Sequence, residues 1–558
     1  MGVNHRRPRG RTAPQAYNAA NALSRPSPSP AALTALAVLL VVALFWPQRR
    51  LGLSLGDEGF LWYGAVWTAR GEVPLRDFQS YTPGRYYWTA AWLSLLHSDG
   101  ILVVRFAAGW FQALGLAATL LCARRVLSTW SNLLVFGFVA ALWMFPLFRS
   151  FDNAMSAAAV LAGLRLLERP TRAAYFAAGA LAGLAMLVGL NHGLYCAAAL
   201  SSLAVYDHLR GGHGERRNLL TWGLGWLAGW APLLAMCALV PGFFGSLIDN
   251  ASVWLRGPYL NVATRSVPWP WLADLAHRGF LAATFDLALG VFFLALPIFC
   301  LVATIRLFKD GDGPGARLLA ASLFAGVPYV HYAFSRPDVF HLATAMPPLL
   351  LGLIGLAHDR GMAAPRRVAI GLAALLLASV STVGVRQPIV QKMLVSREPW
   401  SQLDATDGPL WVRLRDAELI RTVRRLRREN VPPDETLFLA PHWPGLYPVL
   451  GLHSPVWEIF FLFPAEPARE LQMVSDLRRA GVNWAVVCTA GVDGQPDWSF
   501  PRTHALLWTH FTQAWEGTSR EGLPRDCVVM HRRTPVAPAS RTADVPDSVA
   551  TGVPPQVW

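Results

Sequence analysis

Charged residues are scarce in this chain. They occupy only 15% of its 558 positions, whereas hydrophobic residues occupy 53% and the mean hydropathy is +0.34. Soluble globular domains carry about 25% charged residues, so this composition excludes an ordinary soluble protein over most of the length. Lysine is nearly missing, since Lys309 and Lys392 are its two representatives and arginine supplies the remaining positive charge.

The sequence also lacks the usual signatures of a zinc site and of a nucleotide-binding loop. The chain has six cysteines, and no Cys/His spacing suggests a zinc site. No glycine-rich phosphate loop follows a strand pattern, which counts against a nucleotide-sugar donor held by a soluble Rossmann-like domain.

Cys488 and Cys527 could form a disulfide, provided that their two predicted strands are neighbours.

Long apolar runs dominate what is present. They recur from Ala31 to Val385, and each is long enough to cross roughly 30 Å of hydrocarbon as a helix. A transmembrane barrel would show short alternating segments instead. The sequence therefore predicts an all-α polytopic membrane protein with about eleven transmembrane helices and an uncleaved first anchor. The predicted spans are 31–47, 101–122, 132–148, 150–167, 173–190, 193–208, 219–240, 279–305, 318–334, 341–357 and 368–385.

The net charge of +14 is concentrated in short loops. Arginines recur in every second loop, as the positive-inside rule requires of cytoplasmic loops, so no nucleic-acid partner is needed to explain them. Residues 86–96 are apolar but too short to span, and we expect an interfacial or re-entrant helix there.

The character changes near Arg386. Alternating helix and strand patterns over 386–533 predict a small extracytoplasmic α/β domain, while 1–30 and 534–558 are expected to be disordered. The multi-span domain is predicted over 31–385, with a first outer loop at 48–100. This arrangement suits the bacterial cytoplasmic (inner) membrane.

Under this topology the polar outliers gather on the outer face. They come from the first outer loop, from the loop near residue 150, from a hairpin near residue 192 and from the loop near residue 338. The outlying residues are Asp57, Glu58, Asp77, Arg85, Asp152, His192, Arg336, Asp338 and His341. Ionisable residues at a bilayer edge indicate a functional site, and this set fits an enzyme acting on a lipid-linked substrate.

Three short motifs resemble the GT-C superfamily of integral-membrane glycosyltransferases, which includes protein O-mannosyltransferases and lipid A aminoarabinose transferases. They are the Asp-Glu pair after the first span, the stretch 71–87 with its Tyr-Thr-Pro-Gly-Arg-Tyr-Tyr ending, and Ser-Arg-Pro-Asp-x-x-His at 335–341. The resemblance implies transfer of a sugar from a polyprenyl phosphate to an acceptor hydroxyl of a lipid, a glycan or a protein.

The resemblance also implies roles for the residues. Asp57 matches the acid proposed as general base or as organiser of acceptor and metal, and Glu58 is its partner. Asp152 matches a second acid, which could stabilise positive charge at the anomeric carbon. The donor phosphate is assigned to Arg336 and His341, with Arg85 behind them, because a guanidinium binds phosphate oxygens with two hydrogen bonds. Asp77, Asp338 and His192 support these groups; no cofactor is certain, and a divalent cation stays open.

Structural explanations compete with these roles. Asp57 and Glu58 could begin a solvated helix, Asp152 could be an N-cap, and Asp77 is best explained by a local ion pair with Arg76. Arg336 and Asp338 could pair with each other and shape their loop, and His192 is expected in a turn.

Three alternative functions stay open. A transporter or flippase for a lipid-linked sugar would place polar groups near mid-span and often shows repeats. A polysaccharide ligase or polymerase also uses lipid-linked donors and does not require the first-loop acids. A non-catalytic relative would keep the scaffold without the site.

Overall fold

The structure is a computed structural model that describes residues 28–210, 216–256, 266–277, 279–308, 312–362, 364–461, 467–488, 500–514, 522–524 and 527–535. The predicted disordered residues 1–27 and 536–558 lie outside this part. The chain divides into two compact units. The helical unit comprises Met1–Arg49, Tyr81–Arg85 and Arg105–Ser396, and the mixed unit comprises Arg50–Ser80, Tyr86–Val104 and Arg397–Trp558. Each unit is described by itself.

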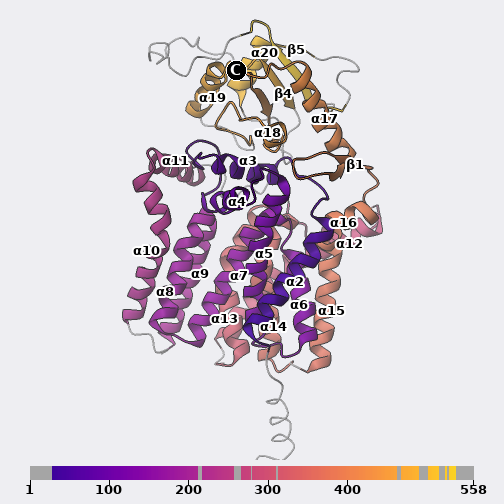
Figure 1. Ribbon diagram of the computed structural model, residues 1–558. Helices are drawn as coiled ribbons and strands as arrows, with labels where there is room; N and C mark the ends of the chain where they lie inside the picture. Colours follow the sequence, from indigo (N-terminus) through magenta and orange to yellow (C-terminus); the bar gives the residue numbers. More distant parts are fainter. Residues whose placement is uncertain are drawn as a thin grey trace, which may run out of the picture. The chain divides into compact units, whose positions relative to one another are not determined.

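Long helices build the helical unit (Figure 1). They are α2 (Pro30–Gln48), α5 (Ile101–Ala123), α6 (Trp130–Trp143), α7 (Ser150–Glu168), α8 (Arg172–Val188), α9 (Leu190–Leu209), α10 (Arg216–Leu239), α11 (Phe243–Arg256), α12 (Phe280–Leu307), α13 (Pro314–Ser335), α14 (Val339–Asp359) and α15 (Pro365–Thr382). Short helical turns lie at Leu147–Arg149, Pro270–Leu272, Gly384–Arg386, Pro388–Val390 and Gln391–Val395.

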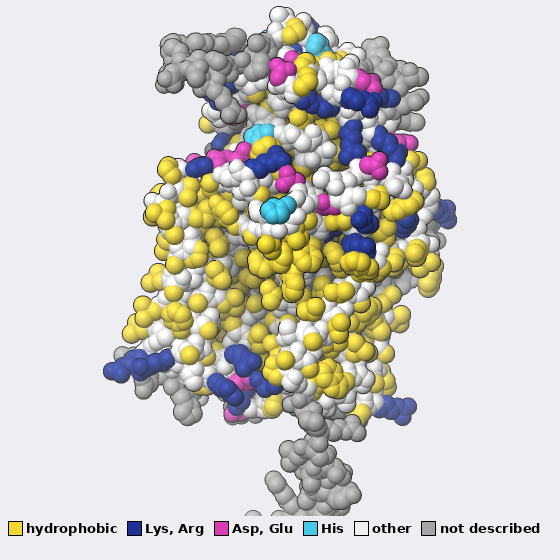
Figure 2. Space-filling view, viewed as in Figure 1, with side chains coloured by type: hydrophobic (Ala, Val, Ile, Leu, Met, Phe, Trp, Pro, Cys, Tyr) yellow, Lys and Arg dark blue, Asp and Glu magenta, His cyan; other side chains and the backbone are white. Residues whose placement is uncertain are grey.

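Each predicted span overlaps one of these helices, although 132–148 runs past the end of α6 at Trp143 and across the break before Leu147. The predicted all-α membrane class is confirmed, and the count of about eleven spans stays a prediction. Among the described residues, seven helices are long and apolar enough to cross a membrane, or eight if α6 and the segment Leu147–Glu168, bent by 99° at their break, form one span. Hydrophobic side chains accordingly cover the visible face of the unit, and basic ones gather along its lower edge (Figure 2). The predicted short segment forms α4 (Gly84–Leu95), whose 12 residues extend only about 18 Å.

Ion pairs distinguish one end of the helical unit from the other. At one end, Arg125 after α5 pairs with Glu168 at 2.6 Å, and Arg306 pairs with Asp359 at the end of α14 at 2.6 Å. Asp152 lies at the opposite end of α7 from Glu168, and Asp338 lies at the opposite end of α14 from Asp359. Basic loops and candidate site residues are thus separated by the length of the helices, as the charge pattern predicted.

Small residues bring α13 and α14 together. Gly315 on α13 faces Gly355 on α14 so closely that a Cβ at either position would press on the other backbone. Such small-residue contacts let membrane helices approach closely. The close pair lies at the start of α13 and near the end of α14, and the short connection at the other end of the two helices carries Arg336 and Asp338.

The mixed unit contains a four-stranded sheet in the order β3-β4-β6-β5, and a separate hairpin of β1 and β2. β3 runs parallel to β4, and the remaining pairs are antiparallel. The elements are α3 (Asp57–Ala69), β1 (Trp400–Leu403), β2 (Leu410–Arg413), α17 (Leu414–Glu429), β3 (Leu437–Ala440), α18 (Leu446–Leu450), α19 (Pro467–Arg479), β4 (Trp484–Cys488), α20 (Pro501–His510), β5 (Phe511–Gln513) and β6 (Cys527–Arg532).

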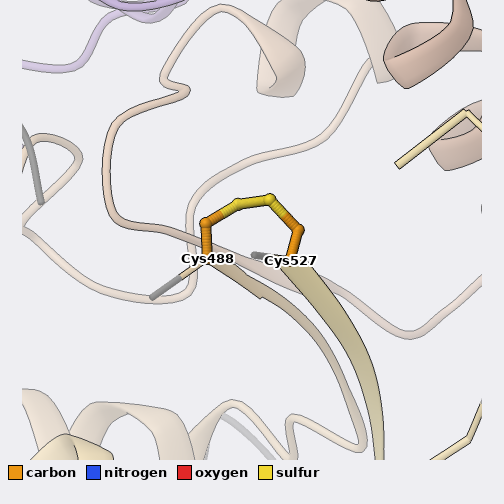
Figure 3. The surroundings of a disulfide bond; sticks show 2 residues. All are labelled: Cys488 and Cys527. Atoms are coloured by element: carbon orange, nitrogen blue, oxygen red, sulfur yellow. A yellow bond between two sulfur atoms is a disulfide. The ribbon is translucent and has the colours of Figure 1, made fainter. Parts of the chain in front are cut away.

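A disulfide joins Cys488 and Cys527 (Figure 3). The two residues face each other in the register of antiparallel β4 and β6, with their Cα atoms 3.9 Å apart. The condition that the sequence left open, that these strands be neighbours, is therefore met, and the disulfide is confirmed.

Part of the first loop packs with the C-terminal segment inside the mixed unit. Gly59 on α3 lies against the backbone of Gly445, and the Gly445 amide donates to the Leu55 carbonyl at 2.8 Å. One turn further along α3, the Tyr63 hydroxyl accepts from the Ser454 amide at 3.2 Å. These contacts place the start of α3 directly beside the turn at 441–445.

Candidate functional site

Asp57 and Glu58 form the first turn of α3, after Gly56 at the N-cap. Asp57 is half-buried and Glu58 is buried. A Glu58 carboxylate oxygen accepts from the Ser54 amide at 3.4 Å, so this side chain helps to hold the start of the helix. Carboxylates in a first turn are also stabilised by the helix dipole. The arrangement therefore agrees with the structural explanation, in which the two acids begin a helix. Asp57 is the one of the two that has solvent access.

The imidazole of His442 lies against Gly56, the residue before these acids, within the mixed unit. A Cβ at Gly56 would overlap its ring, with Cε1, Nδ1 and Nε2 as the nearest atoms. The same ring packs edge-on against Phe460, with centroids 4.0 Å apart. Sequence reasoning did not select His442.

Asp152 anchors a buried charged triad in the helical unit. One of its carboxylate oxygens lies 3.0 Å from Arg85 Nη2 and 2.9 Å from His192 Nε2. Arg85 is 7% exposed, Asp152 4% and His192 1%. The other nitrogen of His192, Nδ1, lies 3.2 Å from the Tyr329 hydroxyl. Four segments of the chain thus meet at one hydrogen-bonded group.

Two sequence-based interpretations are wrong here. Asp152 does not cap α7, because it lies inside the first turn and its carboxylate is directed to Arg85 and His192. His192 is not in a hairpin turn, because α8 ends at Val188 and α9 begins at Leu190, which places His192 in the first turn of a helix. A break of one residue was too short for the sequence to reveal.

The triad changes what Arg85 can do. Its Nε donates to the Val188 carbonyl at 3.0 Å, and its guanidinium lies 4.7 Å from the ring centre of Tyr81. A phosphate would have to compete with Asp152 for this arginine. Arg85 and Asp152 are therefore better placed to organise the site than to contact a substrate.

A second cluster surrounds the connection between α13 and α14. Asp338 caps α14 by accepting from the Phe340 and His341 amides at 2.8 and 2.9 Å. The same carboxylate lies 2.9 Å from His341 Nδ1 and 3.5 Å from Arg336 Nε. Burial opposes the charge of Asp338, but the hydrogen bond and charge of His341, with the charge of Arg149, outweigh it and hold the pKa well below its usual range. The capping contacts support the loop-shaping reading of this carboxylate.

Tyr332 connects the two clusters. Its ring lies 5.0 Å from that of His341 and 5.9 Å from that of His192, and its hydroxyl lies 3.3 Å from Arg149 Nη1. Sequence reasoning did not select Tyr332 or Arg149 as site residues. Arg149 precedes α7 directly, and its place beside Asp152 in the sequence was the available signal.

Asp77 is explained by local structure. It pairs with Arg76 at 2.7 Å and accepts from the Val73 amide at 2.7 Å. Burial raises the pKa of Asp77, but the hydrogen bonds from Arg76 and Val73 outweigh that effect and lower it overall. The expected local ion pair is confirmed, and it shapes the first loop.

Among the residues that the structure describes, no three His, Cys, Asp or Glu side chains are grouped as metal ligands. The charged clusters are instead rich in arginine.

Glu458 supplies a pH-dependent prediction. This carboxyl is 7% exposed, and burial raises its pKa from 4.5 to about 7 against the opposing charge of Arg469, 3.4 Å away. Below pH 4.5 both folded and unfolded states are protonated. As the pH rises towards 7 the unfolded state releases the proton first, and about 3 kcal/mol of stability is lost. We expect the melting temperature of the purified protein to fall between pH 5 and 7.5, and to fall less in Glu458→Gln.

Glu429→Gln is the control, because Glu429 is an exposed carboxylate of the same unit. Its pH profile should match that of the wild type. Parallel profiles for Glu458→Gln and the wild type would show that Glu458 does not titrate in this range.

No family model matches the chain, and no curated protein matches it in sequence. Among solved structures, ArnT from Cupriavidus metallidurans in the apo state is 14% identical, with 88% of this chain and 97% of that chain covered and a TM-score of 0.48. The same protein bound to undecaprenyl phosphate is 14% identical over 89% and 97%, with a TM-score of 0.39. The Archaeoglobus fulgidus oligosaccharyltransferase tethered with an acceptor peptide is 13% identical over 82% and 69%, with a TM-score of 0.39.

Proposed function

We propose that this protein is a multi-pass glycosyltransferase of the bacterial inner membrane that takes a sugar from a polyprenyl phosphate and transfers it to an acceptor hydroxyl. The observation that carries the proposal is the group of charged residues at one end of an otherwise apolar helical unit. There Arg85, Asp152 and His192 are joined through Tyr332 to Arg149 and the cluster around Asp338. Charged side chains at the end of a membrane bundle indicate a site for a polar group on a lipid.

The donor phosphate is assigned to Arg336 and His341. Arg336 is half-buried, and its guanidinium pairs with Asp338 at 3.5 Å, longer than a hydrogen bond. A phosphate offers more acceptor atoms and more charge than this single carboxylate. The leaving group is already a phosphate, so cationic and hydrogen-bonding groups can stabilise it without protonation.

Asp57 is assigned to the acceptor. A carboxylate that removes a proton from an attacking hydroxyl makes it a better nucleophile. The proton passes to Asp57, the new glycosidic bond forms and the bond to phosphate breaks in one displacement, which inverts the anomeric centre. Glu58 supports Asp57 by holding the first turn of α3 through the Ser54 amide. The acceptor side, with the C-terminal segment, is extracytoplasmic in this proposal.

The test is transfer from a panel of radiolabelled polyprenyl-phosphate sugars into membrane extract by the protein purified in detergent. We expect one donor to support transfer. We also expect Arg336→Gln to raise the donor KM about 10- to 100-fold, because a charge-assisted hydrogen bond contributes about 1.5–3 kcal/mol.

Arg317→Gln is the matched control. Arg317 also pairs with a carboxylate, Asp312, at 3.0 Å, but at the end of the unit that carries the basic loops. Its donor KM should equal that of the wild type. No transfer from any donor with acceptor present would overturn the proposal, and equal KM values for the two variants would remove Arg336 from the donor site.

A further inference from the structure

We propose that His442 is a positioning residue for Asp57, so that the C-terminal segment contributes directly to the acceptor site. This inference rests on the proposed function and deepens it. All the residues that carry it belong to the mixed unit.

The first observation is the fit between Gly56 and the imidazole. The ring atoms nearest to a Cβ at Gly56 would be Cε1, Nδ1 and Nε2, so the edge that carries both nitrogens faces the N-cap of α3. Asp57 is the next residue in the chain and the first of the helix. The polar edge of His442 therefore lies beside the backbone from which the Asp57 carboxylate projects.

The second observation is that the turn carrying His442 is held against α3 by its backbone. The Gly445 amide donates to the Leu55 carbonyl at 2.8 Å, and Gly59 leaves no room for a Cβ against Gly445. On the other side, the Phe461 amide donates to the Pro441 carbonyl at 2.9 Å. The position of the imidazole is thus set by backbone contacts on both sides of the turn.

The third observation is that the ring itself is packed. Phe460 contacts His442 edge-on at 4.0 Å and Phe60 on α3 at 5.4 Å, so a wall of aromatic side chains runs from α3 to the imidazole. Aromatic packing of this kind restricts the rotation of a ring. A restricted imidazole against Gly56 limits the movement of the backbone from which Asp57 follows. Small errors in the placement of a reacting group cost up to about 100-fold in rate.

The packing role and the polar role of His442 can be separated. His442→Phe keeps an aromatic ring against Phe460 but removes both nitrogens, whereas His442→Asn and His442→Gln restore a hydrogen-bonding atom near Nδ1 or Nε2. We expect His442→Phe to lower kcat about 10- to 100-fold, with the donor KM and the melting temperature unchanged. One of the amide variants should recover at least a third of the wild-type kcat.

Gly56→Ala tests the same contact from the other side. Gly56 has a negative φ of −77°, with ψ −88° just outside the main α region, and the added methyl group would occupy the place of the imidazole. We expect this variant to lose kcat as His442→Phe does, because the ring must move. Gly245→Ala is the control, since a Cβ there meets no atom within 4 Å.

The outcomes distinguish the inference from the proposed function. Wild-type transfer with full activity in His442→Phe overturns the inference and leaves the glycosyltransferase proposal intact. Reduced melting temperature in His442→Phe, with activity lost in proportion, shows a purely structural ring and also overturns it. No transfer by the wild type overturns both.

Discussion

Asp57→Asn is expected to abolish detectable transfer while the protein stays folded. The amide is nearly the same size as the carboxylate, but it cannot accept the proton of an acceptor hydroxyl. General-base assistance contributes roughly 10²–10⁴-fold to a rate, which makes this the largest expected effect on activity. The measurement is initial-rate transfer from the donor that supports wild-type activity.

Two neighbouring acids serve as controls. Asp77→Asn should affect transfer weakly, because Asp77 is already paired with Arg76 and the Val73 amide. Glu58→Gln keeps an acceptor for the Ser54 amide and should also retain activity. Equal transfer by Asp57→Asn and the wild type would remove Asp57 from the mechanism, and the acid pair would then be only the start of a helix.

Asp152→Asn is expected to have the largest effect on stability. Asp152 is 4% exposed and provides the counter-charge for Arg85, which is 7% exposed. Removing one partner of a buried ion pair leaves an uncompensated charge and typically costs about 3–5 kcal/mol. We expect a clear drop in the melting temperature of the detergent-purified protein. The measurement is the loss of monodispersity as the protein is heated.

The double variant Arg85→Gln/Asp152→Asn tests whether the loss of stability comes from the uncompensated charge of Arg85 or from the lost contact with Asp152. If the cost arises from the uncompensated guanidinium, the double variant should be more stable than Asp152→Asn alone. The exposed pair of Arg70 and Asp99, with side chains 43% and 47% exposed, is the control. Asp99→Asn should change stability by no more than about 1 kcal/mol. A melting temperature of Asp152→Asn as high as that of Asp99→Asn would contradict the anchoring role.

The same variant also distinguishes two roles of Asp152. If Asp152 is an anchor that organises α7, α9 and Arg85, transfer should persist in Asp152→Asn at a temperature where the variant is folded. A residue that stabilises charge at the anomeric carbon would lose activity at every temperature. The hydrogen bonds to Arg85 and His192 favour the anchoring role.

The membrane class and most helices could be predicted from the sequence, because long apolar runs have few alternatives in a chain of this composition. Helices alternating with strands were also predicted for the C-terminal segment, where the apolar residues of α17 and α19 recur with helical spacing. The strands β1, β2 and β5 were missed, because each has three or four residues that mix apolar with polar or charged side chains, whereas β3, also of four residues, is apolar throughout.

The candidate residues were selected by chemistry, but their partners were not. The sequence by itself determined that Asp57, Asp152 and Arg336 are charged residues near the ends of apolar segments, because hydrophobic length and charge are local properties of the chain. Only the tertiary structure decided that Asp152 binds Arg85 and His192, and that the turn at 441–445 lies against Gly56 and Gly59. These contacts join segments far apart in the sequence, and they depend on how helices and turns pack, which no periodicity within a single segment records.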